Sequence, residues 1–165
     1  QKTAYEIPKR DWSSDVCSSD LKLYLDLEAM SYEHQFTYSV IVDPTLELDE
    51  IQIPSMVIQP YVENAIWHGI AHKTERGKVI LAFVKKNDAL FCFVEDNGIG
   101  RTRAAEIETN RPNSHTAKGM KLTQERLANI HSVSGKNASL NIVDLYDKQN
   151  APRGTRVEIY LPIEE

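Results

Sequence analysis

The sequence has little cysteine, no long apolar run and no excess of basic charge, and each scarcity excludes a class of protein. Two cysteines among 165 residues provide neither a disulfide framework nor a zinc-ligand spacing, which fits a reducing compartment. No stretch approaches the roughly 18–20 apolar residues of a membrane span, and no signal peptide is visible. The formal net charge of −5 provides no basic field for nucleic acid. The composition therefore favours a globular domain that binds no nucleic acid.

One segment, DWSSDVCSSDL (Asp11–Leu21), has no apolar period of either helix or strand. In one reading frame it resembles the translated end of a short-read sequencing adapter, so we interpret it as an assembly artefact; a Ser/Asp-rich surface loop is the alternative. It contains Cys17 and three of the acids, so the net charge of −5 becomes −2 without it. Residues 1–10 are then an uncertain linker remnant. The sequence does not begin with Met, and we expect segments upstream.

The 154 residues outside this segment suit one domain with a core. We expect a linker helix within residues 22–35, its apolar face formed by Leu23, Leu27 and Met30, with His34 at the margin. A second helix is predicted from Ser55 to about His72, with a buried stripe formed by Ile58, Val62, Ala65, Ile66 and Gly69. Pro60 should kink this helix and free the carbonyl of Met56. Cys92 lies in an apolar run and is expected to be a small buried hydrophobe.

The other elements follow from apolar periodicity and turn residues. Strands are predicted at 36–43, 77–87, 89–96, 138–147 and 154–162, helices at 101–109 and 120–135, and a loop at 110–119. The second and third strands form a hairpin. Strand pairs mixed with helices in this order predict an α/β (α+β) sandwich, in which helices cover one face of a mixed, largely antiparallel sheet.

Polar residues interrupt the apolar helix that contains QPYVENAIWHGI. Asn64 offers an oxygen ligand of the kind that Mg²⁺ prefers, and His68, four residues later, shares its helix face. An ordinary polar helix edge is the alternative for this motif.

The motif VEDNGIG follows a hydrophobic strand. Asp96 can accept a hydrogen bond from an adenine amino group, and Gly98 and Gly100 allow the backbone to approach a ring closely. A simple turn is the alternative. The motif is not a dinucleotide fingerprint, because Arg103 stands where a third glycine is required, nor is it a Walker loop.

A third motif, HTAKGMKLTQERL, joins a loop to a helix. Gly119 at this junction exposes backbone N–H groups at a positive helix end, which suits phosphate. An ordinary loop-to-helix transition is the alternative.

Together, in this order, the motifs resemble the Bergerat-fold ATP-binding domain that gyrase-type ATPases and histidine kinases share. Within that group, the chain from about Lys22 to Pro162 resembles the catalytic domain of LytS-like sensor histidine kinases, with residues 36–165 as the ATP-binding domain. The resemblance implies that Asn64 ligates Mg²⁺, that Asp96 reads adenine beside Gly98 and Gly100, and that Thr155 supports Asp96. It further implies that Gly119, with Lys118 and Met120, closes residues 110–118 over the phosphates of ATP as a lid.

Three positions depart from the family pattern. Trp67 replaces a lysine that contacts phosphate, and Lys73 or His72 would be its substitute. Ala117 replaces the first glycine of the second glycine box. Pro60 stands where the ATPase branch has a glutamate that activates water, so water is not expected to be the phosphoryl acceptor.

The resemblance implies transfer of the γ-phosphoryl group of ATP to a histidine. None of the five histidines has the family's phosphoacceptor context, so we expect the acceptor on an upstream dimerisation domain. The implied partners are that domain, a second copy in a homodimer, and a response regulator. The implied location is cytoplasmic, in a bacterial inner-membrane sensor kinase. A serine kinase of the anti-sigma type, a hydrolase of the same fold and a non-catalytic nucleotide-binding or dimerisation module are the alternatives.

Overall fold

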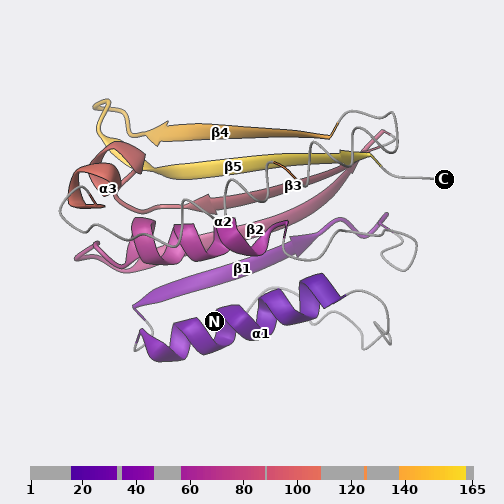
Figure 1. Ribbon diagram of the computed structural model, residues 1–165, viewed down its shortest axis with the longest axis horizontal. Helices are drawn as coiled ribbons and strands as arrows, with labels where there is room; N and C mark the ends of the chain where they lie inside the picture. The colour runs from indigo at the N-terminus through magenta and orange to yellow at the C-terminus, as the bar shows by residue number, and fades with distance from the viewer. Residues whose placement is uncertain are drawn as a thin grey trace.

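A five-stranded sheet forms the base of the domain (Figure 1). The computed structural model describes residues 16–32, 35–46, 57–87, 89–108, 125 and 138–162. The strands are β1 (Phe36–Val42), β2 (Gly77–Lys86), β3 (Ala89–Asp96), β4 (Ser139–Tyr146) and β5 (Pro152–Pro162). They lie in the order β1-β2-β3-β5-β4; β1 is parallel to β2 and the other neighbours are antiparallel. The predicted mixed, largely antiparallel sheet is confirmed, including the β2–β3 hairpin.

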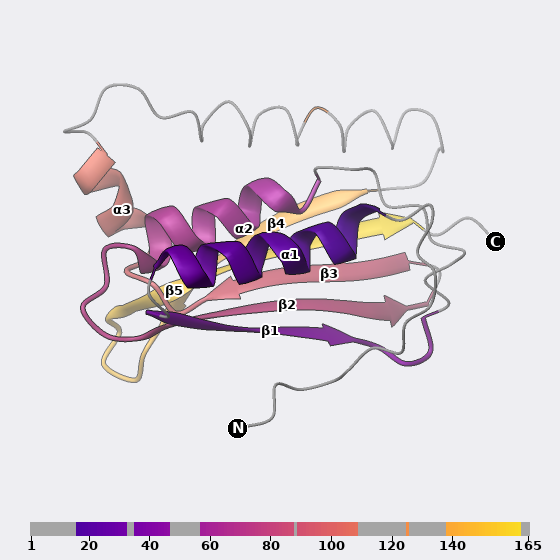
Figure 2. The same cartoon turned by 90° about the horizontal axis from the view of Figure 1, so that it is seen from below.

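The helices cover one face of this sheet, as predicted (Figure 2). They are α1 (Val16–Ser31), α2 (Gln59–Asn64), its π-helical continuation η2 (Ala65–Ile70), and α3 (Arg101–Glu108) at one end of the sheet. Strands alternate their side chains between two faces, so one set from each strand meets the helices. The best-buried members of the resulting core include Leu25, Ile58, Val62, Ile66, Val79, Leu81, Leu90 and Ile159. Burying each such aliphatic side chain contributes about 1.5–3 kcal/mol.

The predicted apolar face of the first helix is wrong. Leu23, Leu27 and Met30 are 59%, 55% and 67% exposed. The face that packs on the sheet instead contains Leu21, Leu25 and Ala29, a stripe of every fourth residue. α1 starts at Val16, inside the segment interpreted as an artefact. Leu21 is the last residue of that segment, so the sequence outside the segment contains only part of the buried stripe. The exposed stripe of Leu23, Leu27 and Met30 lies wholly outside the segment and is therefore more visible. His34 lies outside the described residues.

The expected kink at Pro60 is also absent from the structure. Val57 and Ile58 form a bend, and α2 begins at Gln59, so Pro60 lies in the first helical turn. Proline is tolerated there because the N–H groups of the first turn have no partner within the helix. The predicted buried stripe of this helix is correct, since Ile58, Val62, Ala65, Ile66 and Gly69 are all buried. Met56 lies outside the described residues.

The remaining elements agree with the sequence, within the limits of the described residues. The short helix α3 and the strands β4 and β5 occur where expected, although β5 begins two residues early at Pro152. The predicted loop 110–119 and almost all of the predicted helix 120–135 lie outside the described residues. Within the described part of the chain, no helix combines the length and apolar character needed to cross a membrane.

Candidate functional site

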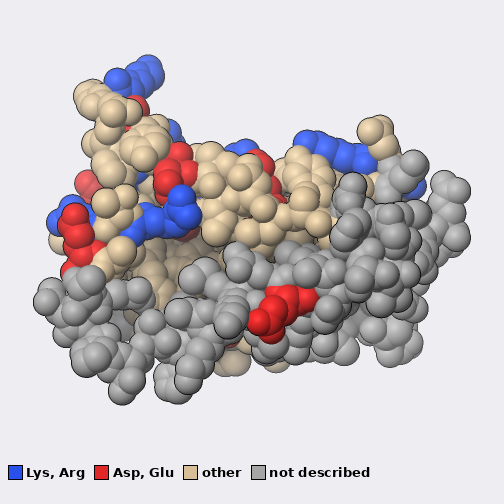
Figure 3. All heavy atoms as spheres, turned by 45° about the horizontal axis from the view of Figure 1, so that its top comes forward, with Lys and Arg blue, Asp and Glu red and all other residues tan. Residues whose placement is uncertain are grey.

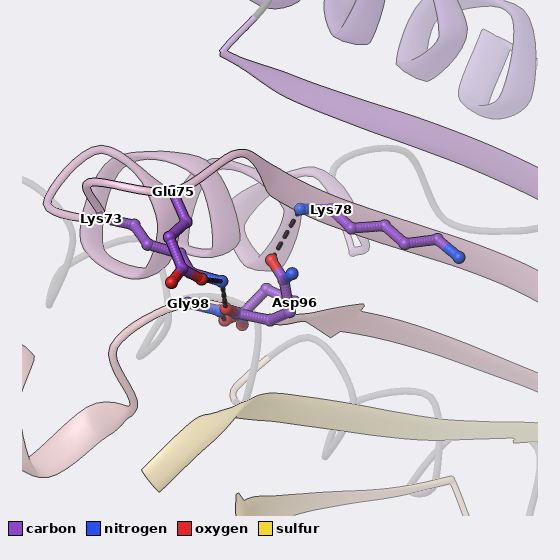
Figure 4. A network of polar contacts seen from close by, with 6 residues as sticks. Lys73, Glu75, Lys78, Asp96 and Gly98 are labelled. Atoms are coloured by element: carbon purple, nitrogen blue, oxygen red, sulfur yellow. Dashed lines mark hydrogen bonds and ion pairs between the residues drawn. The ribbon is translucent and has the colours of Figure 1, made fainter.

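Asp96, the last residue of β3, is a buried carboxylate with few polar partners. Its side chain is only 6% exposed, and one carboxylate oxygen accepts a hydrogen bond from the backbone N–H of Gly98 at 2.8 Å (Figure 4). Burial raises the pKa of Asp96 to about 6, against the opposing effect of the Gly98 and Thr155 backbone amides. Among the described residues, Asp96 is the only buried side chain of the types Asp, Glu, Lys, Arg and His. A buried carboxylate with a raised pKa costs free energy in the folded state, and such groups are typical of functional sites.

Three glycines allow the segments around Asp96 to approach one another closely. A Cβ atom on Gly69 of η2 would lie 2.8 Å from Asp96 Oδ1, and one on Gly98 would overlap the backbone of Gly69. Gly154 has φ +136° and fits against the backbone of Asp96, where a side chain would overlap it. Glycine is therefore required at Gly98 and Gly154 by the close approach of backbone, and at Gly154 also by conformation. At Gly69 a Cβ would instead displace the Asp96 carboxylate.

The turn after Asp96 is bonded to the helical layer. The N–H of Ile99 donates to the carbonyl of Gly69 at 3.1 Å. In the wider turn of a π-helix, carbonyls can leave the regular helical bonding pattern, and such turns are frequent at functional sites. Gly69 is not among the site residues predicted from the sequence. A glycine inside an otherwise helical pattern was the signal that could have found it.

Asn64, the residue at which α2 becomes η2, carries a buried polar atom without a partner. Its side-chain oxygen Oδ1 has no hydrogen bond, and leaving such an atom unsatisfied costs about 1–3 kcal/mol. An oxygen in this situation fits a hard cation such as Mg²⁺. No group of three or more His, Cys, Asp or Glu side chains in the described residues could hold a metal. Phosphate and water oxygens are suitable further ligands for a cation held by Asn64.

His68 lies half-buried on η2, in the same continuous helical segment as Asn64. This segment reaches Asp96 through Gly69. Asn64 lies five residues before Gly69 along this segment.

The two candidates for the missing family lysine lie at the Asp96 end of the site. The Lys73 ammonium donates to the backbone carbonyl of Asn97 at 3.0 Å and lies 3.8 Å from Glu75 (Figure 4). His72 is exposed. Trp67 is 51% exposed, and its indole N–H donates to Glu28 of α1 at 3.3 Å. The residue in the lysine position thus contacts the preceding helix.

Thr155 and Gly100 complete the described part of the site. Thr155 pairs with Asp96 across β3 and β5. Gly100 has φ +80°, and a Cβ there would lie 3.0 Å from Cβ of Pro152. Lys118, Gly119 and Met120 lie outside the described residues, as do the proposed lid at 110–118 and Ala117.

The sequence and fold both have known relatives. The chain is 30% identical over 148 residues to the sensor protein LytS of Oceanobacillus iheyensis, covering 86% of this chain and 23% of that protein. It is 26% identical over 149 residues to the sensor protein LytS of Bacillus subtilis, covering 88% and 23%. The chain thus spans about a quarter of the length of these relatives.

Among solved structures, the mycobacterial sensor histidine kinase MprB matches with a TM-score of 0.56 at 14% identity, over 89% of this chain and 95% of that chain. No family model matches the sequence. The chain is therefore a sequence relative of LytS-type sensor histidine kinases and has the fold of a histidine kinase catalytic domain.

Proposed function

We propose that this chain binds Mg²⁺ and ATP and transfers the γ-phosphoryl group to a histidine on a separate dimerisation domain of a two-component sensor kinase. The observation that carries the proposal is the buried Asp96 carboxylate, which accepts hydrogen bonds from the backbone amides of Gly98 and Thr155 and is closely approached by Gly69. Its oxygens can accept hydrogen bonds from the exocyclic amino group of adenine. Binding there would repay part of the cost of burying a charge.

Asn64 supports the metal part of the proposal. Its unpartnered Oδ1 is suited to hold Mg²⁺, which neutralises phosphate charge and orients the transferred group when bound. The contribution of the protein to phosphoryl transfer is mainly this positioning. Pro60 has no titratable group, which favours an acceptor other than water. We expect the response regulator and a second copy of the full-length protein as further partners, and a cytoplasmic location at a membrane.

A non-catalytic nucleotide-binding module is the second candidate, and Trp67 favours it. The indole of Trp67 contacts Glu28 on α1 and brings no cation to phosphate. Lys73, the proposed substitute, is bonded to the carbonyl of Asn97. Such a protein would bind ADP normally and fail to phosphorylate a histidine.

Calorimetry with Mg²⁺ and ADP tests nucleotide binding. We expect Asp96→Asn to weaken ADP binding at least tenfold, because a hydrogen bond to a charged group is worth about 1.5–3 kcal/mol. The variant should remain folded, since a neutral amide is easier to bury than a carboxylate. Asp43→Asn is the matched control: Asp43 forms a turn with Thr45 after β1, at the other end of the β1–β2 pair from Asp96. Equal ADP affinity in wild type and Asp96→Asn would overturn the proposal.

A phosphotransfer assay separates the two candidates. The chain is mixed with γ-labelled ATP and the histidine-bearing domain of a LytS relative. Acid-labile label on that domain supports the kinase. ADP binding without label transfer supports the non-catalytic module, and rapid release of phosphate without an acceptor contradicts both.

A further inference from the structure

Arg101 and Asp144 form a two-pronged ion pair next to the candidate site. The Nε and Nη2 atoms of Arg101 donate to the two oxygens of Asp144, each at 2.7 Å. Arg101 is the first residue of α3 and directly follows Gly100, whereas Asp144 belongs to β4. The contact lowers the pKa of Asp144, so this carboxylate stays ionised around neutral pH. Two parallel hydrogen bonds between a guanidinium and a carboxylate fix the relative orientation of the two groups and also strengthen their attraction.

The register of the sheet places Asp144 in line with the site. Asp96 pairs with Thr155, and Thr155 pairs with Asp144. Residues opposite one another in neighbouring strands lie on the same face of a sheet. The side chains of Asp96, Thr155 and Asp144 therefore form a row across β3, β5 and β4 on the helix-covered face. Arg101 binds one end of this row, and the glycine turn begins at the other.

Within the described part of the chain, α3 places few apolar side chains against its neighbours. Of the side chains from Arg101 to Ile107, only Ala104 and Ile107 are even half-buried. The preceding turn is anchored at its start, where Asn97 is hydrogen-bonded to Lys73 and Lys78. The N–H groups of Gly98 and Ile99 donate to the Asp96 carboxylate and to the carbonyl of Gly69. At the end of the turn, the carbonyl of Gly100 accepts the first helical bond of α3, from Ala104. At the end of the molecule where α3 lies, Figure 3 shows positive and negative side chains next to one another. The Arg101–Asp144 contact adds a side-chain link between α3 and β4.

A partly exposed ion pair contributes little to global stability. The side chains of Arg101 and Asp144 are 51% and 34% exposed, so their loss should hardly change the unfolding temperature. Local order is a different quantity, because a segment with few apolar contacts opens independently of the core. The effect of this pair should therefore be concentrated in the turn next to Asp96.

We propose that Arg101 and Asp144 are a positioning pair for nucleotide binding: together they hold the turn Asn97–Gly100 in the conformation that the base pocket requires. The inference rests on the proposed nucleotide-binding function. Neither residue needs to touch the ligand. The pair orders the turn before the nucleotide binds, so that less conformational entropy is lost on binding.

Two measurements on the same variants test the pair. Arg101→Gln and Asp144→Asn should each weaken Mg²⁺-dependent ADP binding about 3- to 10-fold in calorimetry. They should also speed amide hydrogen exchange at Ile99 and Ala104, with little change in unfolding temperature. Arg103→Gln and Glu158→Gln are matched controls. Arg103 is an exposed cation on the same helix, and Glu158 is an acid of β5 that contacts Asn141. Both controls should bind ADP like wild type.

The exchanged variant, with Arg101→Asp and Asp144→Arg together, gives the decisive result. Recovery of ADP affinity and of slow amide exchange supports a positioning role. Recovery of slow exchange without affinity would show that the Arg101 side chain acts on the ligand directly, and would overturn the inference. Wild-type affinity in both single variants would overturn it too, provided that Asp96→Asn loses binding. If Asp96→Asn also binds normally, the proposed function itself fails.

Discussion

Asp96 is the described residue at which the cost of burial and the proposed nucleotide binding meet. Its carboxylate is more costly to bury than any neutral side chain of the same size. The amides of Gly98 and Thr155 offset only part of this cost, as the raised pKa of about 6 indicates. A neutral core residue would pack at lower cost in this position. The acid is therefore best explained by what it binds.

The first prediction concerns the pH dependence of nucleotide binding. Because the pKa of Asp96 is raised to about 6, lowering the pH through this value protonates the carboxyl and removes one acceptor for the adenine amino group. ADP affinity should fall as the pH decreases from 7 to 5. Calorimetry across this range checks the prediction. Asp96→Asn, which cannot titrate, should show no such decrease, and a parallel decrease in that variant would assign the effect to another group.

The second prediction concerns Gly69. Alanine is intrinsically better than glycine in a helix by about 1 kcal/mol. However, its Cβ would lie 2.8 Å from Asp96 Oδ1, and the carboxylate would have to rotate away from Gly98. Gly69→Ala should therefore bind ADP several-fold more weakly while its unfolding temperature changes little. Calorimetry and thermal unfolding measure the two effects. Unchanged affinity would mean that the carboxylate has room to move without loss of binding.

At the scale of elements, the sequence predicted the strands well because each is a short apolar run closed by turn residues. Helix faces were harder to predict. α1 has apolar residues on both sides, and a stripe of leucines does not show by itself which side meets the sheet. The start of α2 was missed because a proline in a helical pattern can lie either inside the helix or in its first turn. Only the packing of Val57 and Ile58 into the core decides between these possibilities.

The candidate site was predictable only where its residues belong to local sequence motifs. Asp96, Gly98 and Asn64 lie in local motifs with recognisable chemistry. The contributions of Gly69, Gly154 and Asp144 arise from contacts between segments far apart in the sequence. Asp144 lies in an ordinary strand pattern, and its relation to Arg101 depends on the order of β3, β5 and β4. No local pattern specifies that order.

The third prediction tests which face of α1 packs on the sheet. Leu25 is fully buried, whereas Leu23 is 59% exposed. Leu25→Ala should lower the free energy of unfolding by about 2–5 kcal/mol through lost burial and a new cavity. Leu23→Ala, the same chemical change two residues away, should change it by less than about 0.5 kcal/mol. Urea unfolding of both variants measures the difference, and equal losses would contradict the packing of α1.

At the scale of the whole molecule, three aspartates in or next to the sheet change stability with pH in opposite directions. The pKa of Asp96 is raised by burial, whereas those of Asp43 and Asp144 are lowered by hydrogen bonds from Thr45 and Arg101. A group with a lowered pKa stabilises the folded state at neutral pH and loses this effect as the pH falls. Asp96 acts in the opposite direction, so the pH dependence of the wild type contains both contributions.

The fourth prediction isolates the contribution of Asp96 to folding. The folded protein holds the Asp96 proton up to a pKa of about 6, whereas the unfolded chain releases it near the ordinary value of 3.8. As the pH rises between these values, the wild type should lose stability on the order of 2–3 kcal/mol from this group alone. Asp96→Asn shares every other ionisable group, so the other contributions cancel in the comparison. The variant should therefore gain stability relative to wild type from pH 4 to pH 7 in urea unfolding. A difference that stays constant with pH would show that the carboxyl titrates alike in the folded and unfolded states, and that burial does not disfavour its charge.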